Sequence, residues 1–379
     1  MSVITIHDLN DLKQYLSVKR NYYLYSAGFA AWNFMQSLAS CQISLRIEGV
    51  LVSGSSGNPE QFLGVPVIQY GRGLLKEEDC ILLTVSERFK TEIINHLESC
   101  PAKLVYPSPA IFYYDVYNSI KPFADCFPKG ITGLNRPKAP AGKLIWSCWW
   151  QGEEEAPEIV KACWRSQRRD LGNGRKHIII TKDNYKDYIE IPDYVMDKFQ
   201  NGSNKLAHLA DFIRVCLLYK YGGVWLDSTV LLLKQLPDKC WELPVYTWRF
   251  DNTHFFSDTI WTTWFLAGRQ GNPLCQFVME AFLYYFRNHE HVKYYLTIDY
   301  FISICTHLVD GVLEQFKQIP YNNEKASVLG GHLQERYTEE NFDRYCNGAI
   351  LQKLSRHEMN YDKDSIYAHI VADKYEFKE

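Results

Sequence analysis

One stretch constrains the fold more than any other: LADFIRVCLLYKYGGVWLDST, which runs from Leu209 to Thr229. Its first part repeats apolar residues at helical spacing, and Gly222 and Gly223 then end the helix. The apolar residues that follow predict a short buried strand, and Asp227 stands where that strand ends. In open α/β sheets ligands bind outside the carboxyl ends of the strands, so Asp227 is predicted to meet a ligand.

The helix in this stretch carries two polar residues, Asp211 and Arg214, which are three positions apart and so share a face. His208 lies one turn before Asp211 on the same side. The remaining positions predict an amphipathic helix whose apolar stripe faces the sheet. Two plainer interpretations stay open here, because such a pair is often a surface ion pair worth less than about 1 kcal/mol, and a strand-end aspartate often only caps a turn.

These residue types suit the binding of a nucleoside diphosphate sugar. A divalent cation, Mn²⁺ or Mg²⁺, can join the diphosphate to a carboxylate and neutralise the leaving group. One or two carboxylates, Asp227 among them, suffice for the predicted metal site, because phosphate oxygens and waters can fill the other positions. An acidic side chain beside an arginine, such as Asp211 beside Arg214, can accept hydrogen bonds from sugar hydroxyls.

The segments ADFIR and LLYKYGGVWLDST resemble the bacterial capsular polysaccharide synthesis proteins, which belong with the DXD-sugar glycosyltransferases that include α-mannosyltransferases. A looser resemblance extends from about Lys143 to about Tyr300. It implies a GT-A fold, a nucleotide-sugar donor and retention of the anomeric configuration. The expected reaction is therefore transfer of a hexose to a glycan or lipid-linked glycan in capsule or surface polysaccharide synthesis.

The resemblance also implies roles for single residues. Asp211 and Arg214 match the sugar-binding acid and its partner arginine, and we expect both to be catalytic. Asp227 matches the first aspartate of the DXD motif, while Thr229 stands where the second aspartate is usual. One carboxylate then remains for the metal, and a catalytically weak assembly subunit stays an alternative function. Asp211, Arg214, Asp227, Thr229 and His208 form the expected donor site.

Three further donor-side candidates follow strands of the same domain. Trp149 and Trp150 come directly after an apolar strand, where they flank the nucleotide base or belong to the core. Thr181 ends the next strand, RKHIII, and is predicted to contact the nucleotide.

Four candidates lie later in the chain. His254 and Asp258 precede a predicted strand and are expected on the acceptor side. Asp299 interrupts the apolar helical run LTIDYFISI, and a carboxylate in apolar company is costly unless it is paired. It is either a catalytic acceptor-side residue or a helix acid satisfied by its neighbours. His332 follows two glycines in a predicted loop and is expected to be a late metal or phosphate contact.

Strand and helix patterns alternate in the first part of the chain, which predicts an α/β Rossmann-like domain over residues 1–125. After the proline- and glycine-rich stretch CFPKGITGLNRPKAPAGK, residues 126–379 are expected to form the GT-A domain. The turn SAGFAA has Ser26 where a dinucleotide fingerprint has its first glycine. Two alternatives therefore stay open: a structural or docking domain, and a nucleotide-cofactor-dependent sugar-modifying enzyme run by this domain.

Two segments of the second half have simpler expectations. VLLLKQLP, residues 230–237, is predicted to continue the main sheet after a turn. The charged C-terminal run RHEMNYDKDSIYAHIVADKYEFKE, residues 356–379, is predicted to be a solvated helix or tail.

The amino-acid composition limits the partners and the cellular location that we expect for the protein. The formal net charge of −3 argues against a nucleic-acid partner, and the 11 cysteines show no metal-ligand spacing, which favours reduced thiols. No uncharged apolar run approaches the roughly 18 residues of a membrane span. The expected location is cytoplasmic, with peripheral contact at the inner face of the membrane, or with other polysaccharide-assembly enzymes, left open.

Overall fold

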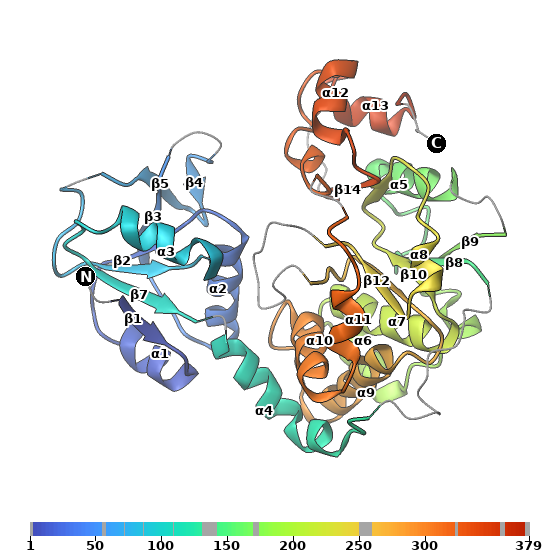
Figure 1. Ribbon diagram of the computed structural model, residues 1–379, viewed down its shortest axis with the longest axis horizontal. Coiled ribbons are helices and arrows are strands. Elements are labelled where there is room, and N and C mark those ends of the chain that lie inside the picture. Colours follow the sequence, from blue (N-terminus) through green and yellow to red (C-terminus); the bar gives the residue numbers. More distant parts are fainter. Residues whose placement is uncertain are drawn as a thin grey trace. The chain divides into compact units, whose positions relative to one another are not determined.

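The computed structural model divides into two compact units (Figure 1). Among the described residues, the first unit contains Met1–Asp125 and His291–Ser303, and the second contains Cys126–Asn252, Thr259–Glu290 and Ile304–Glu379. None of the described helices combines the length and apolar character needed to cross a membrane. The structure describes residues 3–54, 58–71, 73–85, 87–108, 110–130, 142–169, 174–249, 260–322, 325–356 and 361–375.

The first unit is built on a parallel sheet. Its strand order is β1-β7-β6-β2-β3-β5-β4, and neighbours pair in parallel except β4 with β5. The α/β class predicted from the alternating patterns is confirmed. The elements are β1 (Val3–Ile6), α1 (Leu9–Leu16), β2 (Tyr22–Tyr25), α2 (Phe29–Ser40), β3 (Ile47–Val52), β4 (Gln61–Phe62), β5 (Val65–Gln69), β6 (Cys80–Leu83), α3 (Glu87–His96), β7 (Lys103–Pro107) and α4 (Ala110–Cys126).

The second unit has a mixed sheet of order β12-β13-β10-β8-β9. Strands β10, β8 and β9 are parallel, and β13 is antiparallel to both β10 and β12. The elements are β8 (Leu144–Cys148), α5 (Glu158–Arg169), β9 (Lys176–Ile180), α6 (Asp193–Gln200), α7 (Leu206–Tyr221), β10 (Gly223–Leu226), β11 (Val230–Leu232), α8 (Lys239–Glu242), β12 (Val245–Thr247), β13 (Phe265–Gly268), α9 (Pro273–Asn288), α10 (Thr297–Leu308), α11 (Val312–Lys317), α12 (Glu339–Cys346), β14 (Leu351–Lys353) and α13 (Ile366–Val371).

Helix α7 is buried on nearly all sides, so the amphipathic helix predicted from its sequence is wrong. It packs on β8, β10 and β13 and also on α9, which leaves little of its surface in solvent. Asp211 and Arg214 are consequently buried and do not form a surface ion pair. Gly223 leads from this helix into β10 with a φ of 105°, and a Cβ there would lie 2.6 Å from the carbonyl oxygen of Leu144. Only glycine fits this position.

Strand β11 does not continue the main sheet, contrary to the prediction for residues 230–237. It pairs instead with β14, antiparallel, and places Val230 opposite Lys353. The two strands are far apart in sequence, and no local pattern announces such a pairing. This small sheet lies just beyond the carboxyl end of β10, since only Asp227, Ser228 and Thr229 separate β10 from β11.

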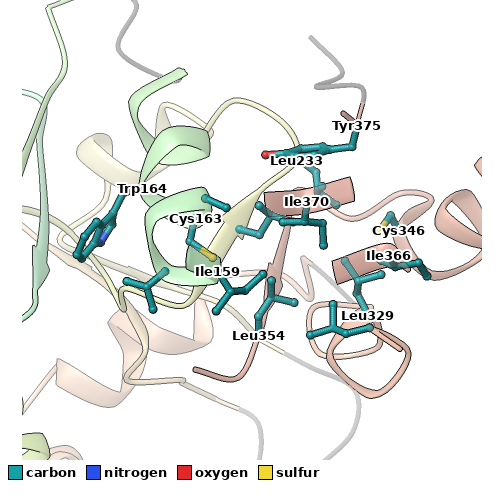
Figure 2. Packing of buried hydrophobic residues seen from close by; sticks show 14 of the residues in the cluster. Ile159, Cys163, Trp164, Leu233, Leu329, Cys346, Leu354, Ile366, Ile370 and Tyr375 are labelled. Atoms are coloured by element: carbon teal, nitrogen blue, oxygen red, sulfur yellow. The ribbon is translucent and has the colours of Figure 1, made fainter. Parts of the chain in front are cut away.

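The C-terminal segment is part of the core, so the predicted solvated tail is wrong for its described residues. Ile366 and Ile370 of α13 are fully buried, and α13 packs against α5. Figure 2 shows both residues in one cluster with Ile159 and Cys163 of α5 and with Leu354, which follows β14. The C-terminus therefore holds β14 in place by hydrophobic burial.

Residues 291–303 belong to the first unit, although most of the second unit precedes them in the sequence. The buried Tyr294 hydroxyl donates a hydrogen bond to Asp115 of α4 at 2.7 Å, and Lys293 Nζ lies 2.7 Å from the same carboxylate. Helix α10 begins in this segment and continues into the second unit. A contiguous fragment of the second half therefore carries a piece of the first unit.

A fragment that begins at residue 126 is expected to unfold at a lower temperature than the whole chain. It keeps Tyr294 but loses its hydrogen-bond partner Asp115 and its packing partner Phe112, so apolar surface that the whole chain buries is exposed to water at about 25 cal/mol per Å². Thermal unfolding of the fragment and the whole chain, followed by circular dichroism, measures the difference. Equal melting temperatures would show that residues 291–303 do not depend on the first 125 residues.

Candidate active site

The carboxyl ends of the parallel strands of the second unit bring several predicted residues to one edge of the sheet. Trp149 and Trp150 follow β8, Thr181 follows β9, and Asp227 follows β10. The strand ends are tied together by hydrogen bonds. Ser228 Oγ donates to the carbonyl oxygen of Cys148 at 2.8 Å, and the backbone N–H of Trp149 donates to Ile180 at 2.9 Å.

Arg214 lies at the centre of the cluster and joins its two aspartates. Its Nη2 is 3.1 Å from Asp211 Oδ1 and 3.1 Å from Asp227 Oδ1. The guanidinium also lies over the ring of Trp225, 4.9 Å from its centroid. Trp225 Nε1 donates to Asp227 Oδ1 at 2.9 Å, so one tryptophan contacts both the arginine and the aspartate. The structure thus brings together Asp211, Arg214 and Asp227, the three site residues that the sequence supports most strongly.

Lys353 completes this cluster, and sequence reasoning missed it. Its Nζ donates to Asp227 Oδ2 at 2.8 Å and to Thr229 Oγ1 at 2.6 Å. Lys353 is the last residue of β14, which the pairing with β11 places beside the end of β10. It is 126 residues from Asp227 in the sequence. Nothing in its neighbourhood, ILQKLSR, distinguishes it from a surface lysine.

Access to solvent differs within the cluster. The side chain of Asp227 is 27% exposed and that of Lys353 is 26% exposed, whereas Asp211 keeps 13% and Arg214 only 5%. A ligand at this edge would therefore meet Asp227 and Lys353 first. Arg214 lies deeper and acts on the two carboxylates.

A buried polar network supports the turn that carries Asp227. Gln167 Nε2 donates to the carbonyl oxygens of Asp227 at 3.3 Å and Val230 at 2.8 Å, which closes the turn between β10 and β11. Ser147 Oγ contacts Gln167 Oε1 at 3.0 Å, and His177 Nε2 lies 3.0 Å from the same hydroxyl. Burial lowers the pKa of His177 to about 3, so its ring is neutral at physiological pH.

Gln167 was not a candidate, but the sequence held a signal for it. It lies four positions after Cys163, on the face that packs into the core, where a polar residue needs a partner. Replacing Gln167 by leucine is expected to lower the free energy of unfolding by about 1–3 kcal/mol, because it leaves a buried carbonyl unpaired. Urea unfolding measures this loss against Gln276→Leu, whose amide donates a hydrogen bond to Glu280 on a partly exposed surface. Equal losses in the two variants would contradict the role of the network.

Comparison with known proteins agrees with the sequence resemblance. Residues 114–371, more than half of the chain, match the family described as capsular polysaccharide synthesis protein. The chain belongs to this family. The predicted resemblance to capsular polysaccharide synthesis proteins is therefore confirmed.

Several relatives of this family member are fungal proteins named as glycosyltransferases. The O-glycosyltransferase braB of Annulohypoxylon truncatum is 25% identical over 161 residues, which cover 39% of this chain and 38% of braB. The O-glycosyltransferase PaGT of Phomopsis amygdali is 25% identical over 157 residues, 38% of each protein. The glycosyltransferase afumC of Aspergillus fumigatus is 41% identical over 51 residues, 14% of this chain and 13% of afumC. The chain thus spans less than half the length of these curated relatives.

The remaining donor-side candidates of this capsular synthesis family member have structural partners. His208 is buried, with Nδ1 3.8 Å from Asp211 Oδ2. Thr181 Oγ1 accepts a hydrogen bond from the backbone of Asp183 at 3.2 Å. Trp149 packs against the core cluster of Figure 2, which favours the core interpretation for it. Trp150 lies 5.2 Å from the ring of Tyr185 and is only partly buried.

The structure does not test the late candidates Asp299, His254 and Asp258 as members of this site. Asp299 lies in α10, within the segment assigned to the first unit, whereas Asp227 belongs to the second. His254 and Asp258, the acceptor-side candidates, lie outside the described residues. The predicted acceptor side therefore stays a prediction.

The described residues around Asp227 do not fit a divalent cation. Both carboxylate oxygens already accept hydrogen bonds from cationic side chains, Oδ1 from Arg214 and Oδ2 from Lys353. In the described part of the chain, no three His, Cys, Asp or Glu side chains gather closely enough to hold a metal ion. His332, the predicted second ligand, is instead 2.8 Å from Glu335 Oε1 through its Nδ1. A requirement for Mn²⁺ or Mg²⁺ stays a prediction.

The ionisation of Asp227 gives the site a testable pH dependence. Burial raises its pKa, but the Lys353 ammonium and the Arg214 guanidinium outweigh burial and hold the pKa below its ordinary value. The unfolded-state pKa is higher, about 3.9. The pairing therefore stabilises the folded chain above that pH and is lost as the pH falls through the folded-state pKa.

Wild-type protein is accordingly expected to lose more unfolding free energy than Asp227→Asn when the pH falls from about 5 to about 2. Urea unfolding at several pH values in this range measures both losses. The same pH dependence in the two proteins would contradict the pairing of Asp227 with the two cations.

Proposed function

We propose that this chain is a glycosyltransferase that moves a hexose from a nucleoside diphosphate sugar to a glycan or lipid-linked glycan, with retention of configuration. One observation carries the proposal: Asp211, Arg214, Asp227 and Lys353 form a charged cluster at the carboxyl edge of a parallel sheet. Membership of the capsular polysaccharide synthesis family and the names of the relatives support the same reaction.

The reaction depends more on electrostatic stabilisation of the leaving diphosphate than on covalent catalysis. The bond between the anomeric carbon and the β-phosphate oxygen breaks, and both electrons leave with the nucleoside diphosphate. The acceptor hydroxyl oxygen forms the new bond on the same face and passes its proton to a diphosphate oxygen. Preorganised charges that oppose the developing negative charge are the largest contribution that such a site can make.

The clustered residues would divide this work. Asp211 would accept hydrogen bonds from sugar hydroxyls, and Arg214 would keep both aspartates ionised and oriented. Asp227 and Lys353, the more exposed pair, would face the diphosphate end of the donor. Trp150, partly buried beside Tyr185, offers an aromatic surface for the nucleotide base.

The fold part of the proposal is a GT-A domain preceded by a Rossmann-like domain. Parallel strands that end at a polar site support the first, and the sheet order of the first unit supports the second. Ser26 follows β2 with a φ of 94°, a conformation that favours glycine, and it stands where a dinucleotide fingerprint has its first glycine. A sugar-modifying enzyme that uses a nucleotide cofactor in this domain is the alternative to be tested.

The setting of the reaction is also a proposal. All 11 cysteines are reduced thiols, and most of them are buried, which supports a reducing compartment such as the cytoplasm. A lipid-linked acceptor would place the protein at the inner face of the membrane, near other polysaccharide-assembly enzymes.

A donor-turnover assay tests the proposed activity. Purified protein is incubated with UDP-glucose, UDP-galactose, UDP-N-acetylglucosamine and GDP-mannose, with and without Mn²⁺, and release of nucleoside diphosphate is measured. Slow hydrolysis of at least one donor by wild type, and none by Asp227→Asn, is the expected result. No turnover of any donor, combined with a thermal shift produced only by NAD or S-adenosylmethionine, would favour the cofactor-dependent alternative. No turnover and no shift with any of them would favour a catalytically weak assembly subunit.

A further inference from the structure

Lys353 Nζ lies 2.8 Å from Asp227 Oδ2, on the carboxylate that the sequence predicts to bind a divalent cation. We propose that the Lys353 ammonium binds the diphosphate of the donor and replaces a divalent cation, so that transfer proceeds without metal. This inference rests on the proposed glycosyltransferase function and adds a catalytic residue to it.

The hydrogen bonds of the ammonium support this role. A lysine ammonium has three N–H donors, and two of them reach Asp227 Oδ2 at 2.8 Å and Thr229 Oγ1 at 2.6 Å. Among the described residues the third donor has no protein partner, and the side chain is 26% exposed. Lys353 can therefore donate a charge-assisted hydrogen bond to an anionic ligand without releasing Asp227.

Thr229 adds a reason specific to this sequence. It stands two positions after Asp227, where a second carboxylate would raise the negative charge of the site. A hydroxyl in this position accepts a hydrogen bond from Lys353 but adds no charge. The Thr229 hydroxyl, in place of a carboxylate, and the Lys353 ammonium both lower the affinity of the site for a second cation.

The charge count leads to the same conclusion. Asp211 and Asp227 contribute two negative charges, and Arg214 and Lys353 contribute two positive charges, so these four groups are neutral together. Without Lys353 the cluster would carry a net charge of −1, which would favour a divalent ion. With Lys353 in place, a metal ion at Asp227 would lie beside an ammonium, and like charges this close repel strongly.

The backbone holds Lys353 in position before any ligand arrives. Lys353 is opposite Val230 in the two-stranded sheet, and the N–H of Leu354 donates to the carbonyl of Thr229 at 2.9 Å. Leu351 and Leu354, on either side of Lys353, are buried. A preorganised cation needs no reorganisation when charge develops on the leaving diphosphate, which is the condition for strong electrostatic catalysis.

The experiment compares donor turnover in EDTA and in Mn²⁺ for wild type, Lys353→Met and Lys353→Arg. Lys161→Met is the matched control, because Lys161 also pairs with a carboxylate, Glu158, but on the surface. The probe is the nucleotide sugar that wild type hydrolyses fastest. Circular dichroism melting of each variant confirms that the protein compared is folded.

Wild type is expected to turn over the donor equally well in EDTA and in Mn²⁺. Lys353→Met should lose about 100-fold in EDTA and should recover partly in Mn²⁺, because the vacated carboxylate oxygen becomes available to a metal. Lys353→Arg, which keeps the charge, should fall between wild type and Lys353→Met. Lys161→Met should behave as wild type.

Two results would overturn the role of Lys353 while the proposed transferase function stands. One is wild-type turnover that EDTA abolishes and Mn²⁺ restores, a result that needs no variant to fold. The other is Lys353→Met turnover in EDTA equal to that of Lys161→Met. Absence of turnover by wild type in both conditions would instead overturn the transferase function itself, and the role of Lys353 with it.

Discussion

Replacing Asp227 by asparagine is expected to lower donor turnover by about 100- to 1,000-fold. The carboxylate accepts hydrogen bonds from Arg214, Trp225 and Lys353, and it sets the position of both cations. An amide can still accept from Trp225 Nε1, but it carries no charge to hold the ammonium. The initial rate of nucleoside diphosphate release from the best donor measures the loss.

Asp238→Asn is a closely matched control for this substitution. Asp238 is also paired with two cations, Lys143 and Arg175, but its side chain is 62% exposed and follows no strand of the parallel sheet. It should keep full activity. If both variants retain wild-type rates, Asp227 has no part in catalysis. If Asp227→Asn loses more than about 4 kcal/mol of stability, its role is structural instead.

The second large effect is expected at Arg214. Replacing it by methionine keeps most of the volume but removes the only positive charge that contacts Asp211 in the cluster described above. Breaking a buried ion pair by removing one partner costs about 3–5 kcal/mol, because the other charge stays buried without compensation. The same substitution should weaken nucleotide-sugar binding more than binding of the free nucleoside diphosphate, since Asp211 is assigned to the sugar.

A double substitution separates this mechanism from simple loss of contacts. Asp211→Asn combined with Arg214→Met removes the uncompensated carboxylate, so the double variant should be more stable than Arg214→Met alone. Urea unfolding of the two single variants and the double variant measures the coupling. Additive stability losses would show that the two side chains do not act as a unit.

The sequence predicted the parts of the site that lie close together along the chain. Asp227 was placed at a strand end because the double glycine and the short apolar run define that strand locally. The pairing of Asp211 with Arg214 follows from helical spacing alone. Both arguments use only residues that are close together along the chain, and a single sequence is enough to identify them.

The rest of the site depends on long-range contacts. Lys353 reaches Asp227 only because β14 pairs with β11, and strand pairing between distant segments leaves no local pattern. Helix α7 is buried on nearly all sides because α9 also packs on it, and the residue pattern of α7 does not predict that contact. The C-terminal run contains many charged residues and few apolar ones. Those that enter the core, Ile366 and Ile370 among them, lie in one short helix, which is too short to show a clear apolar period.

The assignment of the charged cluster to a nucleotide sugar is tested most directly by calorimetric titration. UDP- and GDP-sugars are titrated into wild type and into Asp227→Asn, with Asp238→Asn as the control. At least one nucleotide sugar is expected to bind wild type and the control with the same affinity. Asp227→Asn should bind it at least about 10-fold more weakly, because it loses the charged hydrogen bond that positions the Lys353 ammonium. Binding of the same strength in all three proteins, or no binding of any nucleotide sugar to wild type, would contradict the assignment.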